Sequence, residues 1–182
     1  MHAMTAANLR SAHGGESMAH MRYKIWADQA QREGFANVAR LFRAVSAAEQ
    51  AHATGHFKAL RGEAGAFEVV AAAGFGLDST SQNLSGAIAG EEFEINEMYP
   101  AYLTVAQMQG EAAAVKSMGY AVAAEKIHAA LYRKAREAVD AGRDLAIGKI
   151  QICTNCGHTL EGEAPDVCPV CKVKRELYAE FA

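Results

Sequence analysis

Two copies of the motif Glu-x-x-His lie far apart in the sequence, at Glu49 and His52 and again at Glu125 and His128. Residues three apart in a helix share a face, so each motif directs a carboxylate and an imidazole to the same side. A single glutamate precedes each motif by about the length of a helical hairpin, Glu16 in the first half and Glu91 in the second. A helix running up and its neighbour running down return the chain to the same height, so the four elements can converge at one level of a bundle.

This set of side chains is typical of a dinuclear metal site in the core of a four-helix bundle. Oxygen donors with one imidazole per metal suit iron or manganese. The alternative is a set of solvated glutamates and hydrogen-bonded histidines. However, the neighbours of Glu49 and Glu125 are largely apolar, and a buried carboxylate without a partner costs several kcal/mol. We therefore interpret six residues as metal ligands: Glu16, Glu49, His52, Glu91, Glu125 and His128.

The second half carries an additional carboxylate. Glu94 follows Glu91 by three residues and shares its face, whereas the corresponding position in the first half is Ala19. We expect Glu94 to face the metals as a further ligand, and the remaining acidic residues of this stretch, Glu92 and Glu97, to lie on a solvated face. Pro100 follows within the helical pattern and removes a backbone hydrogen bond, which predicts a kink or bulge just beyond the site.

The four cysteines of the chain lie close together near its C-terminus, as two Cys-x-x-Cys pairs: Cys153 with Cys156 and Cys168 with Cys171. Two such pairs at this spacing indicate one tetrahedral site of four thiolates rather than a disulfide framework. Thiolates bind either zinc, as a structural ion, or iron, as a one-electron carrier. The positions of Gly157 and Pro169 favour the rubredoxin type, and we expect one iron ion, with zinc as the alternative.

The elements that position these residues follow from the breaks in the helical pattern. Breaks near Gly34, across residues 62–79 and near Gly110 leave four long helical stretches. A long central connection between two short ones is the connectivity of a ferritin-like four-helix bundle. We predict a mainly α protein with that bundle at residues 1–142, a linker at 143–151 and a small rubredoxin-like metal-binding domain at 152–182.

Composition excludes several classes of function. The chain has 182 residues and a formal net charge of -3, so it presents no broad basic surface for nucleic acid or for an anionic membrane. It contains no apolar run of about 18 residues, and its first residues lack the apolar core of a secretory signal. These features predict a cytoplasmic protein.

In order along the chain, five segments resemble the motifs of the rubrerythrin family: GESMAHMRY (15–23), EQAH (49–52), AGEEFEINEMYP (89–100), EKIH (125–128) and CTNCG with CPVC. The resemblance implies a non-haem di-iron peroxidase that reduces hydrogen peroxide to water. It also implies two irons in the bundle, electrons arriving through the four-cysteine iron, and a homodimer or larger assembly in which helices can be exchanged. The implied donor is a reduced rubredoxin or its reductase, which makes the activity NAD(P)H-linked.

The resemblance further implies individual roles. Glu49 and Glu125 bridge the irons, and His52 and Glu94 exchange on one iron with its oxidation state, which makes them the catalytic pair. Tyr23 and Tyr99 match tyrosines near the family's site, and we expect them to donate hydrogen bonds to ligand carboxylates, with packing in the core as the alternative.

Two histidines depart from the family pattern. His20, one turn after Glu16, could face the metals, and His158 could leave the cysteine site more exposed. His56, one turn beyond His52, is a candidate to support the ligands. A near-helical apolar pattern predicts core positions at Trp26, Phe35, Leu41, Phe42 and Phe57.

Two other functions remain open from the sequence alone. The same ligand set suits a ferroxidase or an oxygen-reducing oxidase, and zinc in both sites would make the protein a non-catalytic metal-binding protein.

Overall fold

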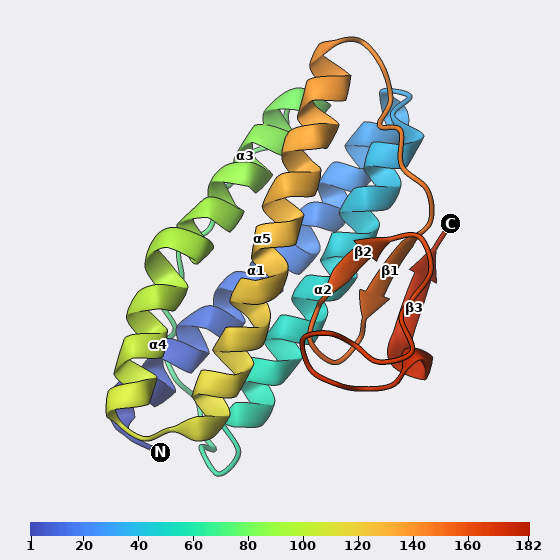
Figure 1. The fold of residues 1–182 in the computed structure, drawn as a ribbon. Helices are drawn as coiled ribbons and strands as arrows, with labels where there is room; N and C mark the ends of the chain where they lie inside the picture. The colour runs from blue at the N-terminus through green and yellow to red at the C-terminus, as the bar shows by residue number, and fades with distance from the viewer.

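A computed structural model describes residues 1–182 and confirms a mainly helical bundle followed by a small sheet domain (Figure 1). The first helical hairpin consists of α1 (Ala3–Arg32) and α2 (Ala36–Ala59). The second consists of α3 (Thr80–Phe93), a π-helical turn η1 (Glu94–Met98) and α4 (Tyr99–Met108), paired with α5 (Ala112–Asp140). Short turns close both hairpins, and the long connection joins them, as the sequence predicted.

The connection between the hairpins, residues 60–79, runs from one end of the bundle to the other without regular secondary structure (Figure 1). It is held to α1 by hydrogen bonds in which Ser11 Oγ donates to the carbonyl of Val70 (2.7 Å) and Trp26 Nε1 donates to that of Gly76 (2.9 Å). Ser79 then caps α3, because its hydroxyl accepts from the backbone N–H of Gln82. The crossover therefore delivers the second hairpin antiparallel to the first.

The expected irregularity near Pro100 is the π-helical turn η1, in which the N–H of Tyr99 bonds the carbonyl of Glu94. A π turn inserts one residue into a helix. Accordingly, Tyr99 follows Glu91 by eight residues, whereas Tyr23 follows Glu16 by seven. Because of the extra residue, both tyrosines can lie on the ligand face of their helices.

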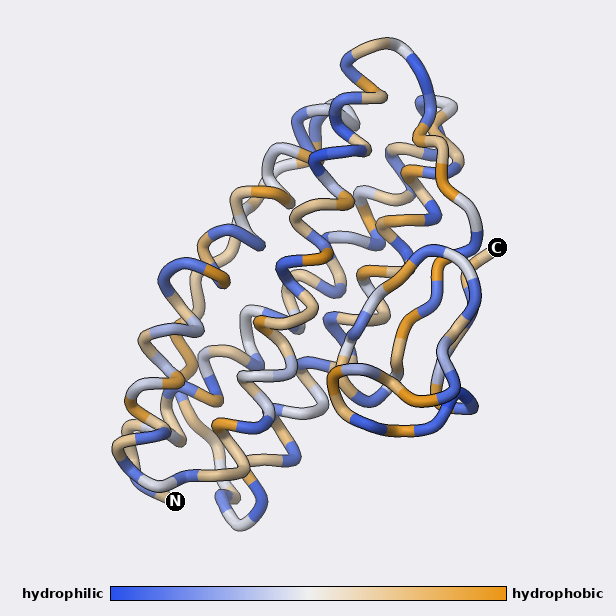
Figure 2. Tube along the Cα trace, in the orientation of Figure 1, coloured by the Kyte–Doolittle hydropathy of each residue, from blue (hydrophilic) through white to orange (hydrophobic).

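Two apolar clusters fill the bundle, one toward each end. The first includes Trp26, Leu41 and Phe42, and the second includes Leu9 and Met118. Polar and apolar residues alternate along each helix in the manner of amphipathic bundle helices (Figure 2). Among the predicted core positions, Trp26, Leu41 and Phe42 are buried and Phe35 is partly buried.

The core prediction is wrong for Phe57, which is 65% exposed. The neighbouring His56 occupies the inward position of this turn and is completely buried. Adjacent helical residues point about 100° apart, so Phe57 is directed to the surface, where its ring lies against that of His13.

The C-terminal domain is a three-stranded antiparallel sheet in the order β2-β1-β3, formed by β1 (Ile150–Cys153), β2 (Thr159–Glu161) and β3 (Tyr178–Phe181), with a 3-10 turn η2 (Arg175–Leu177) before β3. Ile150 and Ile152 of β1 join the apolar cluster of α1 and α2. The sheet therefore packs on the bundle of its own chain. The division at residues 142 and 152 stays a prediction; α5 ends at Asp140 and β1 begins at Ile150.

No helix combines the length and the apolar character that crossing a membrane requires.

Candidate metal centres

The bundle brings six of the predicted ligands to one level, as two overlapping groups. One group contains Glu16 and His52, the other contains Glu91 and His128, and both contain Glu49 and Glu125. Within each group the candidate ligand atoms all lie within 4.8 Å of one another, and every residue is buried. Two neighbouring positions that share two carboxylates are the arrangement expected of a dinuclear site.

The two histidines face these groups with the same ring nitrogen. Nδ1 of His52 lies 2.8 Å from Glu49 Oε2, 2.8 Å from Glu125 Oε1 and 3.9 Å from Glu16 Oε1. Each carboxylate comes from a different helix.

In the second group, Nδ1 of His128 lies 2.7 Å from Glu125 Oε2, 3.5 Å from Glu49 Oε1 and 3.8 Å from Glu91 Oε2. Each imidazole thus faces one carboxylate of its own helix and two from other helices. The first hairpin thus contributes Glu16 and His52 to one group, and the second contributes Glu91 and His128 to the other.

The carboxylates have buried oxygen atoms that are free to bind cations. In three of them one buried oxygen has no hydrogen-bond partner: Glu16 Oε2, Glu49 Oε1 and Glu91 Oε2. Buried polar atoms are nearly always partnered, and an unpaired buried charge costs several kcal/mol. Two hard cations shared among four carboxylates and two imidazoles satisfy all of these atoms, so the residues fit a dinuclear metal site.

Without a cation, protons must balance this charge. Burial and the neighbouring carboxylates raise the pKa of Glu16 and of Glu91 well above the ordinary glutamate value. Burial alone would lower the pKa of His128, but the hydrogen bond to Glu125 and the nearby carboxylate of Glu49 outweigh it and raise that pKa to about 9. Metal binding therefore has to displace protons from this cluster.

Two buried tyrosines hold the outer carboxylates in a crossed pattern. Tyr99 of α4 donates a hydrogen bond to Glu16 Oε1 on α1, and Tyr23 of α1 donates one to Glu91 Oε1 on α3 (2.7 Å). The expected tyrosine contacts are therefore present. Because each hydroxyl restrains a carboxylate of a different helix, the two hairpins fix each other's ligands.

Glu94 lies at the start of η1, half-buried, and belongs to neither group. Burial, followed by the charges of Glu125 and Glu49, raises its pKa well above the ordinary value. Among the neighbouring charges, that of Glu94 raises the pKa of Glu16 most. The charge of Glu94 also raises the pKa of Glu91, so Glu94 acts on a carboxylate of each group. The other acidic residues of this stretch lie outward: Glu92 pairs with Arg133, and Glu97 is exposed.

His56 and His20, the two histidines considered as additional residues of the bundle site, have different positions. His56 is buried, and its Nε2 lies 2.9 Å from the hydroxyl of Tyr99. Burial, with the charge of His52, lowers the pKa of His56 to about 3, so its ring is neutral. His20 does not reach the ligands: its Nδ1 bonds the carbonyl of Ser46 (2.7 Å) on the flank of α2. His20 follows Glu16 by one turn of α1, and its side chain therefore lies beside the face of α1 that carries Glu16.

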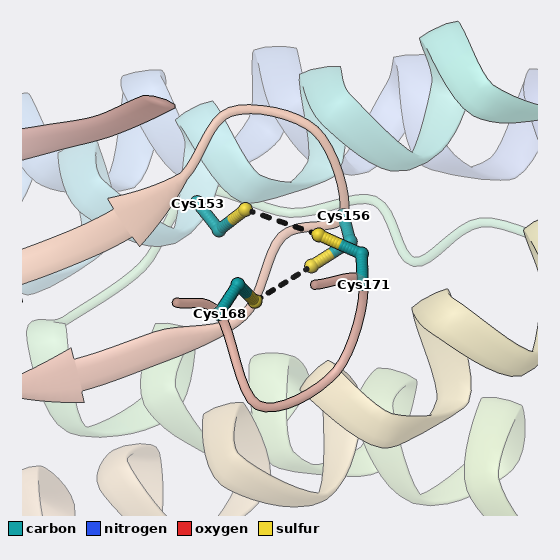
Figure 3. Close-up of side chains that lie close together, drawn as sticks. All are labelled: Cys153, Cys156, Cys168 and Cys171. Carbon is teal, nitrogen blue, oxygen red and sulfur yellow. Dashed lines mark hydrogen bonds between the residues drawn. The ribbon is translucent and has the colours of Figure 1, made fainter. Parts of the chain in front are cut away.

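The four cysteines form the second site (Figure 3). None is in a disulfide; Sγ of Cys153 lies 3.6 Å from Sγ of Cys171, and Sγ of Cys156 lies 3.7 Å from Sγ of Cys168. Their separation exceeds that of a covalent S–S bond and fits four thiolates around one ion.

The two Cys-x-x-Cys turns have the same backbone form. The residue after each second cysteine has a positive φ, 76° at Gly157 and 65° at Lys172, and donates its N–H to the carbonyl of the first cysteine. His158 is half-buried and its Nδ1 lies 2.9 Å from the hydroxyl of Tyr178, so it packs beside the site.

Comparison with known proteins agrees with both sites. Residues 7–136 match the family model described as Rubrerythrin, and residues 151–179 match the model described as Rubrerythrin, rubredoxin-like domain. This chain belongs to the rubrerythrin family. The predicted family and fold are confirmed, and the chain carries the ligand sets of a di-iron carboxylate site and of a four-cysteine rubredoxin-like site.

Individual rubrerythrin relatives match along nearly their whole length. The chain is 46% identical to Rubrerythrin-2 of Clostridium acetobutylicum, covering 98% of this chain and 97% of that protein. It is 32% identical to nigerythrin of Nitratidesulfovibrio vulgaris, covering 97% and 86%. A solved structure of fully reduced, all-ferrous nigerythrin superposes with a TM-score of 0.85 at 31% identity, covering 100% of this chain and 88% of that one.

In this member of the rubrerythrin family the two sites touch through the outer nitrogens of the histidines. Nε2 of His52 lies 3.2 Å from the carbonyl oxygen of Cys156, and Nε2 of His128 lies 2.8 Å from Oγ1 of Thr159. Any side chain at Gly157 would overlap the ring of His52. The glycine therefore satisfies both a positive φ and a close approach.

Sequence reasoning missed Thr159, which contacts His128, and Ser117, whose Oγ lies 2.9 Å from Nδ1 of His56. Both contacts join residues from distant parts of the chain, and neither residue lies at a spacing that suggests a ligand. The π turn, by contrast, could have been predicted from the sequence, because Tyr99 follows Glu91 by eight residues whereas Tyr23 follows Glu16 by seven.

Proposed function

We propose that this protein reduces hydrogen peroxide to water, with electrons supplied through an iron bound by the four cysteines. The observation that carries the proposal is the contact between the sites: His52 bonds a carboxylate of the bundle site with one nitrogen and the Cys156 carbonyl with the other. The bundle site would hold two electrons, and the adjacent four-cysteine site would deliver them. This arrangement suits a two-electron reduction better than metal storage.

The proposed ligands are the residues of the two groups. Glu49 and Glu125, which both groups share, would bridge two irons. Glu16 and His52 would complete one position, and Glu91 with His128 the other. His52 and Glu94 are proposed to alternate at one ligand position with oxidation state. This assignment is supported by the effect of Glu94 on the pKa of Glu16.

The reaction converts one peroxide, two electrons and two protons into two molecules of water. Two ferrous ions held by these residues would supply one electron each. Glu94 is suited to deliver a proton, because burial and the neighbouring carboxylates raise the pKa of its carboxyl well above the ordinary value. Tyr23 and Tyr99 keep Glu91 and Glu16 in place while charge changes beside them.

The proposed electron donor is a reduced rubredoxin or its NAD(P)H-linked reductase, acting at the four-cysteine iron. A homodimer or larger assembly, an exchange of helices between subunits, and a cytoplasmic location stay predictions from the sequence.

Anaerobic loading with iron followed by single turnover tests the proposal. The reduced protein is mixed with one equivalent of hydrogen peroxide, or with oxygen, and the iron absorbance is followed by stopped flow. Fast oxidation by peroxide and slow oxidation by oxygen is expected. Faster oxidation by oxygen, or catalytic oxidation of added ferrous ions, would favour the oxidase or ferroxidase instead. Elemental analysis showing zinc in both sites after growth with ample iron would contradict redox catalysis.

A further inference from the structure

A cavity of about 270 Å³ lies between α2, α5 and the first cysteine turn. Its lining includes His52 and Cys156 at the inner side and Thr54, Lys58 and Ser117 toward solvent. The cavity therefore approaches both metal sites from outside. A hydroxyl in its wall, that of Ser117, begins a series of side-chain hydrogen bonds into the bundle.

The series has three bonds and ends at a proposed ligand. Ser117 Oγ lies 2.9 Å from His56 Nδ1, and His56 Nε2 lies 2.9 Å from the Tyr99 hydroxyl. Tyr99 in turn donates to Glu16 Oε1. His56, Tyr99 and Glu16 are completely buried, so these bonds cross the apolar wall of the bundle without a gap.

The donor of each hydrogen bond can be assigned by starting from Glu16, the buried end of the series. An ionised Glu16 can only accept, so the Tyr99 hydroxyl donates to it and its oxygen is left to accept from His56 Nε2–H. A neutral imidazole with its proton on Nε2 accepts at Nδ1, and the Ser117 hydroxyl donates there. All three donors therefore point from the cavity toward the carboxylate.

We propose that Ser117, His56 and Tyr99 form a proton path from the cavity to Glu16. In one passage Ser117 takes a proton from a hydronium ion in the cavity, which leaves water, and gives its own to His56 Nδ1. The Nε2 proton of His56 passes to the Tyr99 oxygen, and the Tyr99 proton passes to Glu16. The net change is one proton lost by the hydronium ion and gained by Glu16; no electron moves, and Ser117, His56 and Tyr99 keep their charge.

The second half of the bundle has no such path. Tyr23 donates to Glu91 as Tyr99 does to Glu16, but the rings around Tyr23 are those of Trp26, Phe42 and Tyr132. The residue one turn after His128 is Tyr132, where the first half has His56 one turn after His52. The path thus serves only one side of the site, the side of Glu16.

Only the use of the proton, as one of the two that peroxide reduction consumes, rests on the proposed function. The path itself is testable in full-length protein loaded with zinc, which performs no redox chemistry. Nuclear magnetic resonance of ¹⁵N-histidine protein should show His56 protonated at Nε2 and not at Nδ1. The measurement is the rate at which this Nε2 proton exchanges with water.

Ser117→Ala should slow that exchange by about tenfold or more, since no hydroxyl remains to pass the proton. Ser117→Thr keeps the hydroxyl and should retain most of the exchange rate. Gly55→Ala places a methyl group 3.0 Å from Ser117 Oγ, displaces the hydroxyl and should also slow exchange. Thr54→Ala is the matched control, because it removes a hydroxyl from the same cavity that bonds only its own helix at Gln50.

Unchanged exchange in Ser117→Ala, or His56 protonated at Nδ1 in the parent protein, would overturn the path. In iron-loaded protein the same variant should slow peroxide turnover by about tenfold or more while keeping its metals. If no iron-loaded form reduces peroxide while Ser117→Ala still slows exchange, the proposed function fails and the path stands. If the parent reduces peroxide and exchange is insensitive to Ser117, the path alone fails.

Discussion

His52 contacts both the cysteine site and the bundle site. Its Nε2 lies 3.2 Å from the carbonyl oxygen of Cys156, and its Nδ1 lies 2.8 Å from Glu49 Oε2. One imidazole therefore spans the boundary between the two domains, and the C-terminal domain owes its position partly to a side chain that is also a candidate ligand.

Gly157→Ala should separate the two sites. The new methyl group would overlap the His52 ring, so the cysteine turn must move outward. A displacement of about 1 Å can cost a hundredfold in rate, so we expect electron transfer between the sites to slow by about ten- to a hundredfold. Stopped flow on reduced, iron-loaded protein mixed with peroxide would follow the reoxidation of the four-cysteine iron directly.

Gly162→Ala provides the control for backbone strain. Gly162 also has a positive φ, 98°, but no atom lies within 4 Å of its added methyl group. Both variants should retain metal at both sites. Equal slowing in the two would show that strain within the domain, and not contact with His52, controls the transfer.

Local periodicity explains why the clustering of the candidate ligands could be predicted from the sequence. The pairing of Glu49 with His52, and of Glu125 with His128, depends only on the three-residue spacing of one helical face. Hairpin length then sets the level at which Glu16 and Glu91 meet them. Each of these is a short-range property, and the structure places all six residues together.

Contacts between distant segments could not be predicted in the same way. The docking of the sheet on α2 depends on the packing of Ile150 and Ile152 and on the close approach at Gly157. Nothing in the spacing of the cysteines fixes that orientation. Phe57 shows the related limit on core prediction: an aromatic residue at near-helical spacing still lies outside when its neighbour takes the inward position.

Glu94→Ala should keep the metals but lose rapid peroxide turnover. Glu94 belongs to neither group of close ligand atoms, so its loss leaves both groups intact. Loss of a general acid lowers a rate by about 10²–10⁴-fold, which single turnover on iron-loaded protein would measure alongside metal content. Glu97→Ala, in the same π turn but exposed, should turn over normally. Unchanged turnover in Glu94→Ala would refute its role.

Asp144→Ala should destabilise the bundle although Asp144 follows its last helix. The carboxylate of Asp144 accepts hydrogen bonds from the backbone N–H groups of Asn37 (2.8 Å) and Val38 (3.3 Å), and so caps α2 from a distant segment. Loss of a helix cap costs about 1 kcal/mol, and urea unfolding of zinc-loaded protein would measure the change. Asp166→Ala, whose side chain is 92% exposed, should change stability by less than about 0.5 kcal/mol. Equal effects would argue against the cap.

Removal of the metals should make stability depend on pH near neutrality. The hydrogen bond to Glu125 and the nearby carboxylate of Glu49 overcome burial and raise the pKa of His128 in the fold to about 9, from 6.5. A raised pKa stabilises the folded protein fully below the unfolded value, and this stabilisation is lost as pH rises through the folded value. The raised pKa values of Glu16 and Glu91 act in the same direction. The lowered pKa values of Glu49 and Glu125 act only in acid.

Chelator-treated protein should therefore lose free energy of unfolding, on the order of 1–3 kcal/mol, between about pH 6.5 and pH 9. Guanidinium unfolding at several pH values across this interval would measure the loss. Protein with both bundle positions filled should show a much smaller change, because cations replace the protons that the cluster otherwise requires. A metal-free protein that becomes more stable as pH rises, or a loaded protein that loses as much, would contradict the charge balance that makes these six residues a metal site.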